Sequence, residues 1–134
     1  MIVADVMQAL ADRLDTIAGL RVYAHPPEAI NPPAAVVSYP DSIDYDQTYG
    51  RGMDRMQVPV VVLVKKLSAR VARDDLTRFV DGTGPASVKA VLESGTYTAF
   101  HTIRVSTATV DVVEVAGIDY LAVTFMADIT GSGA

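Results

Sequence analysis

The last third of the chain is patterned for β-structure, and this constrains the fold more than any other feature of the sequence. Between Ile118 and Ile129, apolar side chains recur at every second position, at Leu121, Val123, Phe125, Ala127 and Ile129. Because successive side chains of a strand point to opposite faces, this alternation predicts a strand with one core-facing side. Two further strands are predicted just before it, at residues 102–109 and 110–115, followed by a tight turn at Ala116–Gly117.

Another strand is predicted in the middle of the chain, from Met56 to Lys65. Its residues are apolar on both faces, which is typical of a central strand that is covered on both sides. Pro59 argues against a central position, because proline lacks the N–H that a strand ladder uses and is normally confined to edges or bulges. Shorter strands are predicted at Leu20–Tyr23 and Ala34–Tyr39, with a stiff proline-rich loop between them.

Three segments have the spacing of amphipathic helices. The first covers about residues 3–18 and precedes Gly19, a residue type common just after a helix end. The second is capped by Ser68 and ends at Asp81, and the third is a short helix over about Ala86–Glu93.

The order of helix, strands, helices and strands predicts the fold class. It indicates an α+β domain with a mostly antiparallel sheet, on which an N-terminal helix and one or two further helices pack. The chain of 134 residues has the length of one domain. We expect this domain to cover residues 1–130, followed by a flexible tail at residues 131–134.

Composition and charge exclude several classes of function. The chain has no cysteine, which removes disulfides, thiolate metal sites and thiol nucleophiles and fits assembly in a reducing cytosol. The longest apolar run, Val58–Val64, is too short to span a bilayer, and the N-terminus lacks the features of a secretion signal, so we expect no membrane partner. A net charge of -5 argues against a general nucleic-acid binder.

The charged residues are unevenly distributed along the chain. Residues 1–50 contain two basic and seven acidic side chains, whereas residues 51–104 contain nine basic and five acidic ones. Residues 105–134 contain four acidic side chains and no basic one. This segregation predicts faces of opposite sign that could dock on one another between copies of the chain.

No group of residues has the spacing of a catalytic, metal or cofactor site, and we expect a non-enzymatic protein that needs none. Residues 82–89 resemble a phosphate-binding loop, but they lack its Gly-Lys-Ser/Thr ending and follow a predicted helix instead of a strand. His25 and His101 lie in separate predicted loops without a second ligand at the required spacing. The acidic residues within 41–46 lack the closing Glu and mid-loop Gly of a calcium loop.

The segment at residues 39–55 is the strongest candidate for a functional surface. It holds half of the tyrosines, two arginines, a methionine and two glycines between two predicted strands. Tyr, Met and Arg are enriched at protein interfaces, because they cover much area or make directional contacts. An ordinary long hairpin with aromatic cross-strand pairs is the alternative. The candidate interface with other subunits or partners consists of Asp44, Tyr45, Asp46, Tyr49, Arg51, Met53, Asp54 and Arg55.

Four segments in order along the chain are similar to the tail terminator, or minor tail, proteins of siphoviruses, especially those of actinobacterial phages. These segments are Asp44–Arg55, Val58–Val64, Gly82–Lys89 and Val115–Leu121. The resemblance covers nearly the whole chain and lies in the order of the segments. It implies a small α+β virion subunit that forms a hexameric ring on the tail tube, stops its polymerisation and provides the head–tail joining surface.

The resemblance also implies the partners and the location of the protein. The partners are further copies of the chain, the major tail tube protein and a neck or head-completion protein, with DNA only passing through the lumen. The protein would reside at the tail–neck junction of the virion, and in the host cytoplasm during assembly. Two alternatives stay open: another neck component, such as a head-closure or connector adaptor ring, and a small-molecule or peptide-binding regulator with a concave apolar pocket.

The two arginines of the candidate interface lead to a specific expectation. Arg51 and Arg55 flank Asp54, and across a ring interface either one could pair with acidic residues of a neighbouring subunit. We expect the double change Arg51→Glu and Arg55→Glu to prevent assembly while leaving the melting temperature of the subunit almost unchanged.

Overall fold

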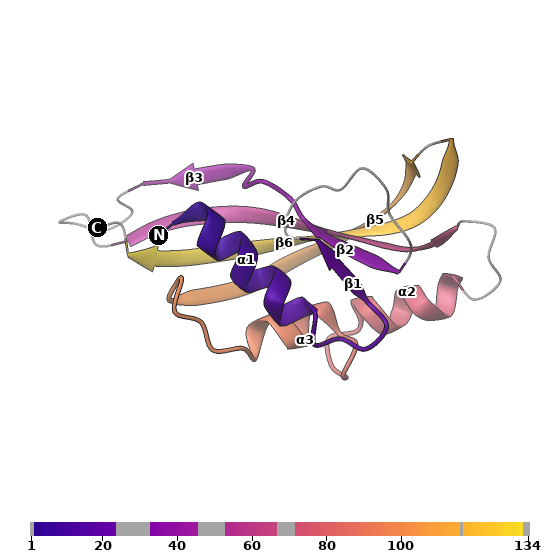
Figure 1. Cartoon of the computed structure of the whole chain (residues 1–134), viewed down its shortest axis with the longest axis horizontal. Coiled ribbons are helices and arrows are strands. Elements are labelled where there is room, and N and C mark those ends of the chain that lie inside the picture. Colours follow the sequence, from indigo (N-terminus) through magenta and orange to yellow (C-terminus); the bar gives the residue numbers. More distant parts are fainter. Residues whose placement is uncertain (1, 24–32, 46–52, 67–71, 116, 133–134) are drawn as a thin grey trace.

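The computed structural model describes residues 2–23, 33–45, 53–66, 72–115 and 117–132. Within these ranges the chain forms six strands in one sheet and three helices (Figure 1). The helices are α1 (Val3–Leu14), α2 (Ala72–Val80) and α3 (Val88–Glu93). The strands are β1 (Arg21–Tyr23), β2 (Ala34–Val37), β3 (Ser42–Asp44), β4 (Met53–Lys66), β5 (Thr102–Val115) and β6 (Ile118–Ser132). The predicted α+β class is confirmed.

The sheet has the strand order β1-β2-β4-β6-β5, and β3 pairs with β4 beyond the end of β2. Every pairing is antiparallel except that of β1 with β2, so the prediction of a mostly antiparallel sheet is confirmed. The prediction of two strands over residues 102–115 is wrong, because β5 is continuous. A shift in register between Val105 and Thr107 accommodates one extra residue as a bulge, which bends a strand without ending it.

β4 is central despite its proline. The carbonyl oxygen of Pro59 accepts a hydrogen bond from the N–H of Ser38, which lies just after the end of β2. In an antiparallel ladder the N–H and C=O of one residue point to the same neighbour, so the missing N–H of Pro59 faces the gap between β2 and β3. The proline therefore costs the sheet little, because it lies where the neighbouring strand is interrupted.

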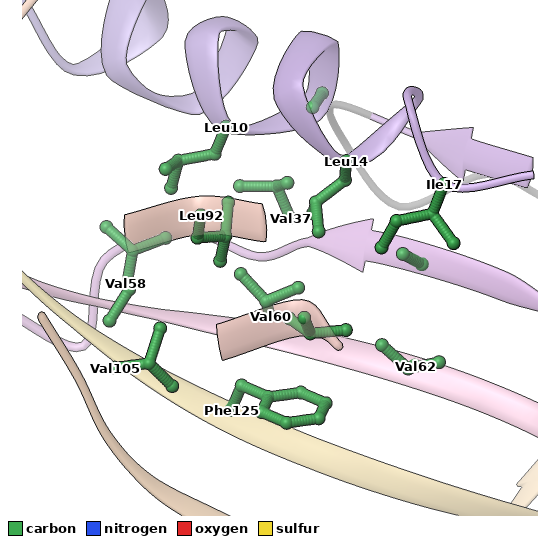
Figure 2. Packing of buried hydrophobic residues seen from close by; sticks show 14 of the residues in the cluster. Leu10, Leu14, Ile17, Val37, Val58, Val60, Val62, Leu92, Val105 and Phe125 are labelled. Carbon is green, nitrogen blue, oxygen red and sulfur yellow. The ribbon is translucent and has the colours of Figure 1, made fainter. Parts of the chain in front are cut away.

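All three helices pack on one face of the sheet, which we call the helix face. Figure 2 shows Leu10 and Leu14 of α1 directed toward Val37, Val58 and Val60 of the sheet. Leu92 of α3 and Phe125 of β6 belong to the same buried cluster. Of the five side chains predicted to face the core along β6, those at positions 123, 125, 127 and 129 are buried, whereas Leu121 is half-buried.

The other side of the sheet, which we call the opposite face, has a smaller apolar cluster of its own. Leu63, Tyr120 and Ala122 are buried there, with Val61 and Val113 packed against them. β4 is central in the sheet, as predicted, but its opposite face is covered only in part, because Leu63 is buried there whereas Val61 is half-buried.

The ends of several elements differ from the prediction. α1 ends at Leu14 and not near residue 18, because the backbone N–H and the hydroxyl of Thr16 both donate to the carbonyl of Arg13 and close the chain into a turn. α3 begins one residue after Ser87, whose hydroxyl accepts a hydrogen bond from the N–H of Ala90. The predicted cap at Ser68 lies outside the described residues.

The C-terminal boundary also moves. β6 continues to Ser132, and its Gly131 is paired with Asp54 of β4, so these two positions are part of the sheet and not of the predicted tail. Residues 133 and 134 lie outside the described residues. The predicted turn before β6 is confirmed at Gly117, whose φ of 79° is in the left-handed region that favours glycine.

Candidate assembly interface

The structure describes five of the eight residues predicted to form the interface. Asp44 ends β3, Tyr45 follows it, and Met53, Asp54 and Arg55 begin β4. The other three predicted residues, Asp46, Tyr49 and Arg51, lie outside the described residues, as does the loop with His25.

The described part of this segment forms a hairpin, because β3 pairs with the start of β4 and places Asp44 directly opposite Arg55. Tyr45 is 68% exposed at the end of β3, and Asp44 is exposed beside it. Asp54 is only 8% exposed, since the alternation along β4 turns it to the same face as buried Met56. The hairpin therefore presents Asp44 and Tyr45 on the surface of the subunit, but not Asp54.

Arg55 has a partner within its own subunit. Its Nη2 lies 3.3 Å from Oδ1 of Asp128 on the adjacent strand β6. Among the described residues, no group donates a well-directed hydrogen bond to that carboxylate oxygen, which is out of contact with solvent. The charge of the Arg55 guanidinium therefore stabilises it. Reversal of the charge at Arg55 was expected to leave the melting temperature of the subunit almost unchanged. This expectation must be revised, because the sheet register brings residues 55 and 128 together from distant parts of the sequence.

The sequence interpretation missed a second exposed element, the far half of the β5–β6 hairpin. Figure 1 shows this end of the two strands curving away from the helices. Every residue of β5 from Ser106 to Val112 is exposed, and Val110 and Val112 are 51% and 45% exposed. A run of β-branched residues next to a tight turn predicted the strands, but not that the helices leave this half uncovered.

The tip of this hairpin is acidic. Glu114 and Asp119 are directly opposite each other across the two strands, and both are exposed. Like charges in directly opposed positions destabilise a strand pair. The far half of the hairpin thus combines exposed valines with two directly opposed acidic residues, features that are found at interaction surfaces.

A polar cluster holds α3 against β5 and lies beside a shallow hollow. Lys89 Nζ lies 2.5 Å from Oε2 of Glu93, and this carboxylate oxygen also accepts the backbone N–H of Val105 at 2.9 Å. Partial burial raises the pKa of Glu93, but the hydrogen bonds from Lys89 and Val105, with the charges of Lys89 and Arg104, outweigh burial and hold the pKa below its usual value. The neighbouring hollow, of about 300 Å³, is lined by both polar and apolar side chains.

A second polar cluster joins α1 to the end of α3. Arg13 Nε donates to the carbonyl of Val91 at 2.8 Å, and the Tyr97 hydroxyl donates to the carbonyl of Leu92 at 2.6 Å. Burial raises the pKa of Tyr97, although the nearby charge of Arg13 acts in the opposite direction. Neighbouring side chains leave no room for a Cβ atom at Gly95. Such an atom would lie only 2.7 Å from the Tyr97 hydroxyl oxygen. These contacts make the junction structural.

Of residues 82–89, positions 82–87 lie in the connection between α2 and α3 and positions 88 and 89 begin α3, as expected for a helix-to-helix turn and not for a phosphate-binding loop. Its Ser87 hydroxyl donates to the carbonyl of Asp81. Across the described ranges, no three His, Cys, Asp or Glu side chains are grouped so that they could hold a metal ion. No helix among these residues is long and apolar enough to cross a membrane.

Comparison of the chain with known protein families and with curated proteins finds no match. The arrangement of exposed strands and charges is therefore the main observation from which a function can be argued.

Proposed function

We propose that this chain is a non-enzymatic phage virion protein, a tail terminator that forms a hexameric ring on the tail tube, stops its polymerisation and joins the tail to the neck. The observation that carries the proposal is the exposed far half of β5. A long outer strand with exposed valines is a template for pairing with another chain, and isolated proteins normally blunt such edges. A subunit of an assembly can keep such an exposed edge, because a neighbouring subunit covers it.

Two other features support an assembly role. Charges of opposite sign lie at distinct places in the fold, with Glu114 and Asp119 exposed at the hairpin tip and Arg21 exposed on β1 at the other edge of the sheet. Surfaces of opposite sign on one subunit favour head-to-tail contacts, which close into a ring when the rotation between copies allows it. The similarity of four segments to tail terminators points to the same function.

The genetic test is deletion of this gene from the phage or prophage that encodes it. We expect unjoined heads and tails of irregular, excessive length in electron micrographs, because nothing stops the tube from growing. The wild-type gene supplied in trans should restore finished particles. Tails of normal length that lack only a head would contradict the proposal and favour a neck adaptor ring.

The biochemical test uses the purified protein. We expect a monomer or weak association at micromolar concentration, and rings with a central hole when the protein is concentrated or mixed with tail tubes. Light scattering and negative-stain microscopy measure both states. Open-ended filaments of this protein alone would contradict the proposal, because a subunit that polymerises without limit cannot terminate a tube.

A further inference from the structure

We infer that neighbouring subunits join edge to edge, with β5 of one copy pairing antiparallel to β1 of the next copy and with Asp111 meeting Arg21 across the junction. The inference rests on the proposed ring-forming function and names the surfaces that build the ring.

β1 and β5 are the two outermost strands of the sheet, and within the described ranges neither has a strand on its outer side. Such an edge presents unpaired backbone N–H and C=O groups that another strand can bind. β1 runs parallel to β2, whereas each later step to β4, β6 and β5 reverses direction. β5 therefore runs opposite to β1, and two copies placed side by side in the same orientation bring these edges together as an antiparallel pair.

The strand registers place two opposite charges at the two ends of one row. From β1 to β5, the row consists of Arg21, Ala34, Leu63, Ala122 and Asp111. Directly opposed residues of a sheet point to the same face. The Arg21 guanidinium and the Asp111 carboxylate therefore both project from the face that lies away from the helices. Repetition of the subunit without a shift in register thus brings Arg21 of one copy directly opposite Asp111 of the next.

These two side chains are available for such a contact. Both Arg21 and Asp111 are exposed, and neither forms an ion pair with another described residue. Among the described residues, the Asp111 carboxylate accepts a hydrogen bond from the backbone N–H of Val112 and from no other group. On the same face of β5, Val113 lies two residues further along, beside the small apolar cluster of the opposite face, so an added strand would also extend this cluster.

A second pair of opposite charges lies at the other end of the sheet, with the signs of the two edges reversed. Arg104 on β5 is in the row of Asp128, Gln57 and Ser42, and Asp44 lies two residues further along β3. At this end the edge strand of the sheet is β3, which lies directly beside β4, whereas at the other end β2 and β1 both lie outside β4. The edge formed by β3 is therefore one strand further from the neighbouring copy. Arg104 and Asp44 therefore attract across a wider gap, which favours the same orientation of the two copies without forming the strand contact.

Disulfide crosslinking tests the pairing directly, because the natural chain has no cysteine. Arg21 and Asp111 are separated by four strand spacings, roughly 19 Å, which is too far for a disulfide within one subunit. The variant with Arg21→Cys and Asp111→Cys should therefore form a ladder of covalent multimers under oxidation, with a closed ring as the largest species. Each single cysteine variant should give almost no dimer.

Charge exchange provides a second test that does not depend on oxidation. Asp111→Arg alone sets Arg against Arg at every junction, and Arg21→Asp alone sets Asp against Asp, so each should weaken association by at least about tenfold. A mixture of the two variants should assemble again, because every junction between unlike subunits then has one acidic and one basic residue. Arg73→Asp, on exposed α2, is the matched control and should assemble like the natural protein; urea unfolding shows whether each variant is folded.

The outcomes separate this inference from the proposed function. Efficient dimers of Asp111→Cys alone would overturn the inference and favour a two-fold pairing of β5 with β5 centred near position 111. Normal assembly of Arg21→Asp alone would also overturn it, because the junction would then not depend on Arg21. Rings of the double cysteine variant that form without a crosslink between positions 21 and 111 would also overturn it while leaving the tail terminator function intact. Crosslinked multimers that grow into open filaments would support the edge pairing and contradict the terminator function.

Discussion

Reversal of the charge at Arg55 should destabilise the isolated subunit, whatever its role in assembly. The guanidinium is the partner of Asp128 across β4 and β6, with 3.3 Å between Nη2 and Oδ1. It is also directly opposite Asp44 of β3. Arg55→Glu therefore places three carboxylates on neighbouring strands, one of them with an oxygen that is out of contact with solvent.

The size of the effect follows from the exposure of the two side chains. Arg55 is 42% exposed and Asp128 is 17% exposed, so the lost ion pair itself contributes only about 1 kcal/mol. Repulsion between two carboxylates about 6 Å apart near a protein surface adds roughly 3 kcal/mol before solvent screening and side-chain rotation reduce it. We expect the free energy of unfolding to fall by about 2–3 kcal/mol, and the melting temperature by roughly 10 °C.

Urea unfolding of the purified subunit, monitored by circular dichroism, measures this loss. Arg55→Gln is the matched control, because it removes the charge without adding repulsion and should cost about 1 kcal/mol. Arg73→Glu on exposed α2 should change stability by less than about 0.5 kcal/mol.

The reasoning would be refuted by an Arg55→Glu subunit that unfolds at the same urea concentration as the natural protein at pH 7. It would also be refuted by equal losses for Arg55→Gln and Arg55→Glu, since repulsion of Asp128 would then contribute nothing. In either case Arg55 would be free for contacts between subunits, as its sequence context first indicated.

Three further variants test the packing and the polar clusters. Phe125→Ala removes a ring that is 1% exposed in the main core and should cost about 3–5 kcal/mol in urea unfolding; a loss below about 1 kcal/mol would mean that the core collapses around the cavity. Gly95→Ala forces a Cβ to within 2.7 Å of the Tyr97 hydroxyl oxygen and should lower the free energy of unfolding by about 1–3 kcal/mol. Gly82→Ala is the control and should lower it by almost nothing, because no atom lies within 4 Å of the added Cβ. Equal effects of the two variants would contradict the close contact at Gly95. Glu93 has a lowered pKa in the folded state, so its stabilisation is present above the unfolded value and is lost as the pH falls through the lowered one. Glu93→Gln should therefore lower stability by about 1 kcal/mol at pH 7 and by much less at pH 3, which parallel urea titrations would show; an equal loss at both pH values would contradict this.

Local periodicity was sufficient to predict most of the elements of this fold. Side chains that alternate along β6 or recur at helical spacing in α1 reveal which positions must be buried, because the geometry of one strand or one helix sets that spacing. The mostly antiparallel sheet and the connection between α2 and α3 follow from the same patterns. The hairpin at residues 39–55 was likewise recognisable from its composition, although only part of it lies in the described residues.

The tertiary structure decided what depends on contacts between distant segments. Pro59 is tolerated in a central strand because β2 ends and β3 begins beside it, and Arg55 is paired because β6 brings Asp128 from a distant part of the sequence. The exposure of β5 likewise follows from where the helices pack, and the row that joins Arg21 to Asp111 exists only after five strands are in register. A residue's own sequence neighbourhood determines its face on a strand or helix, but only strand order and register determine which charges meet and which edge remains free.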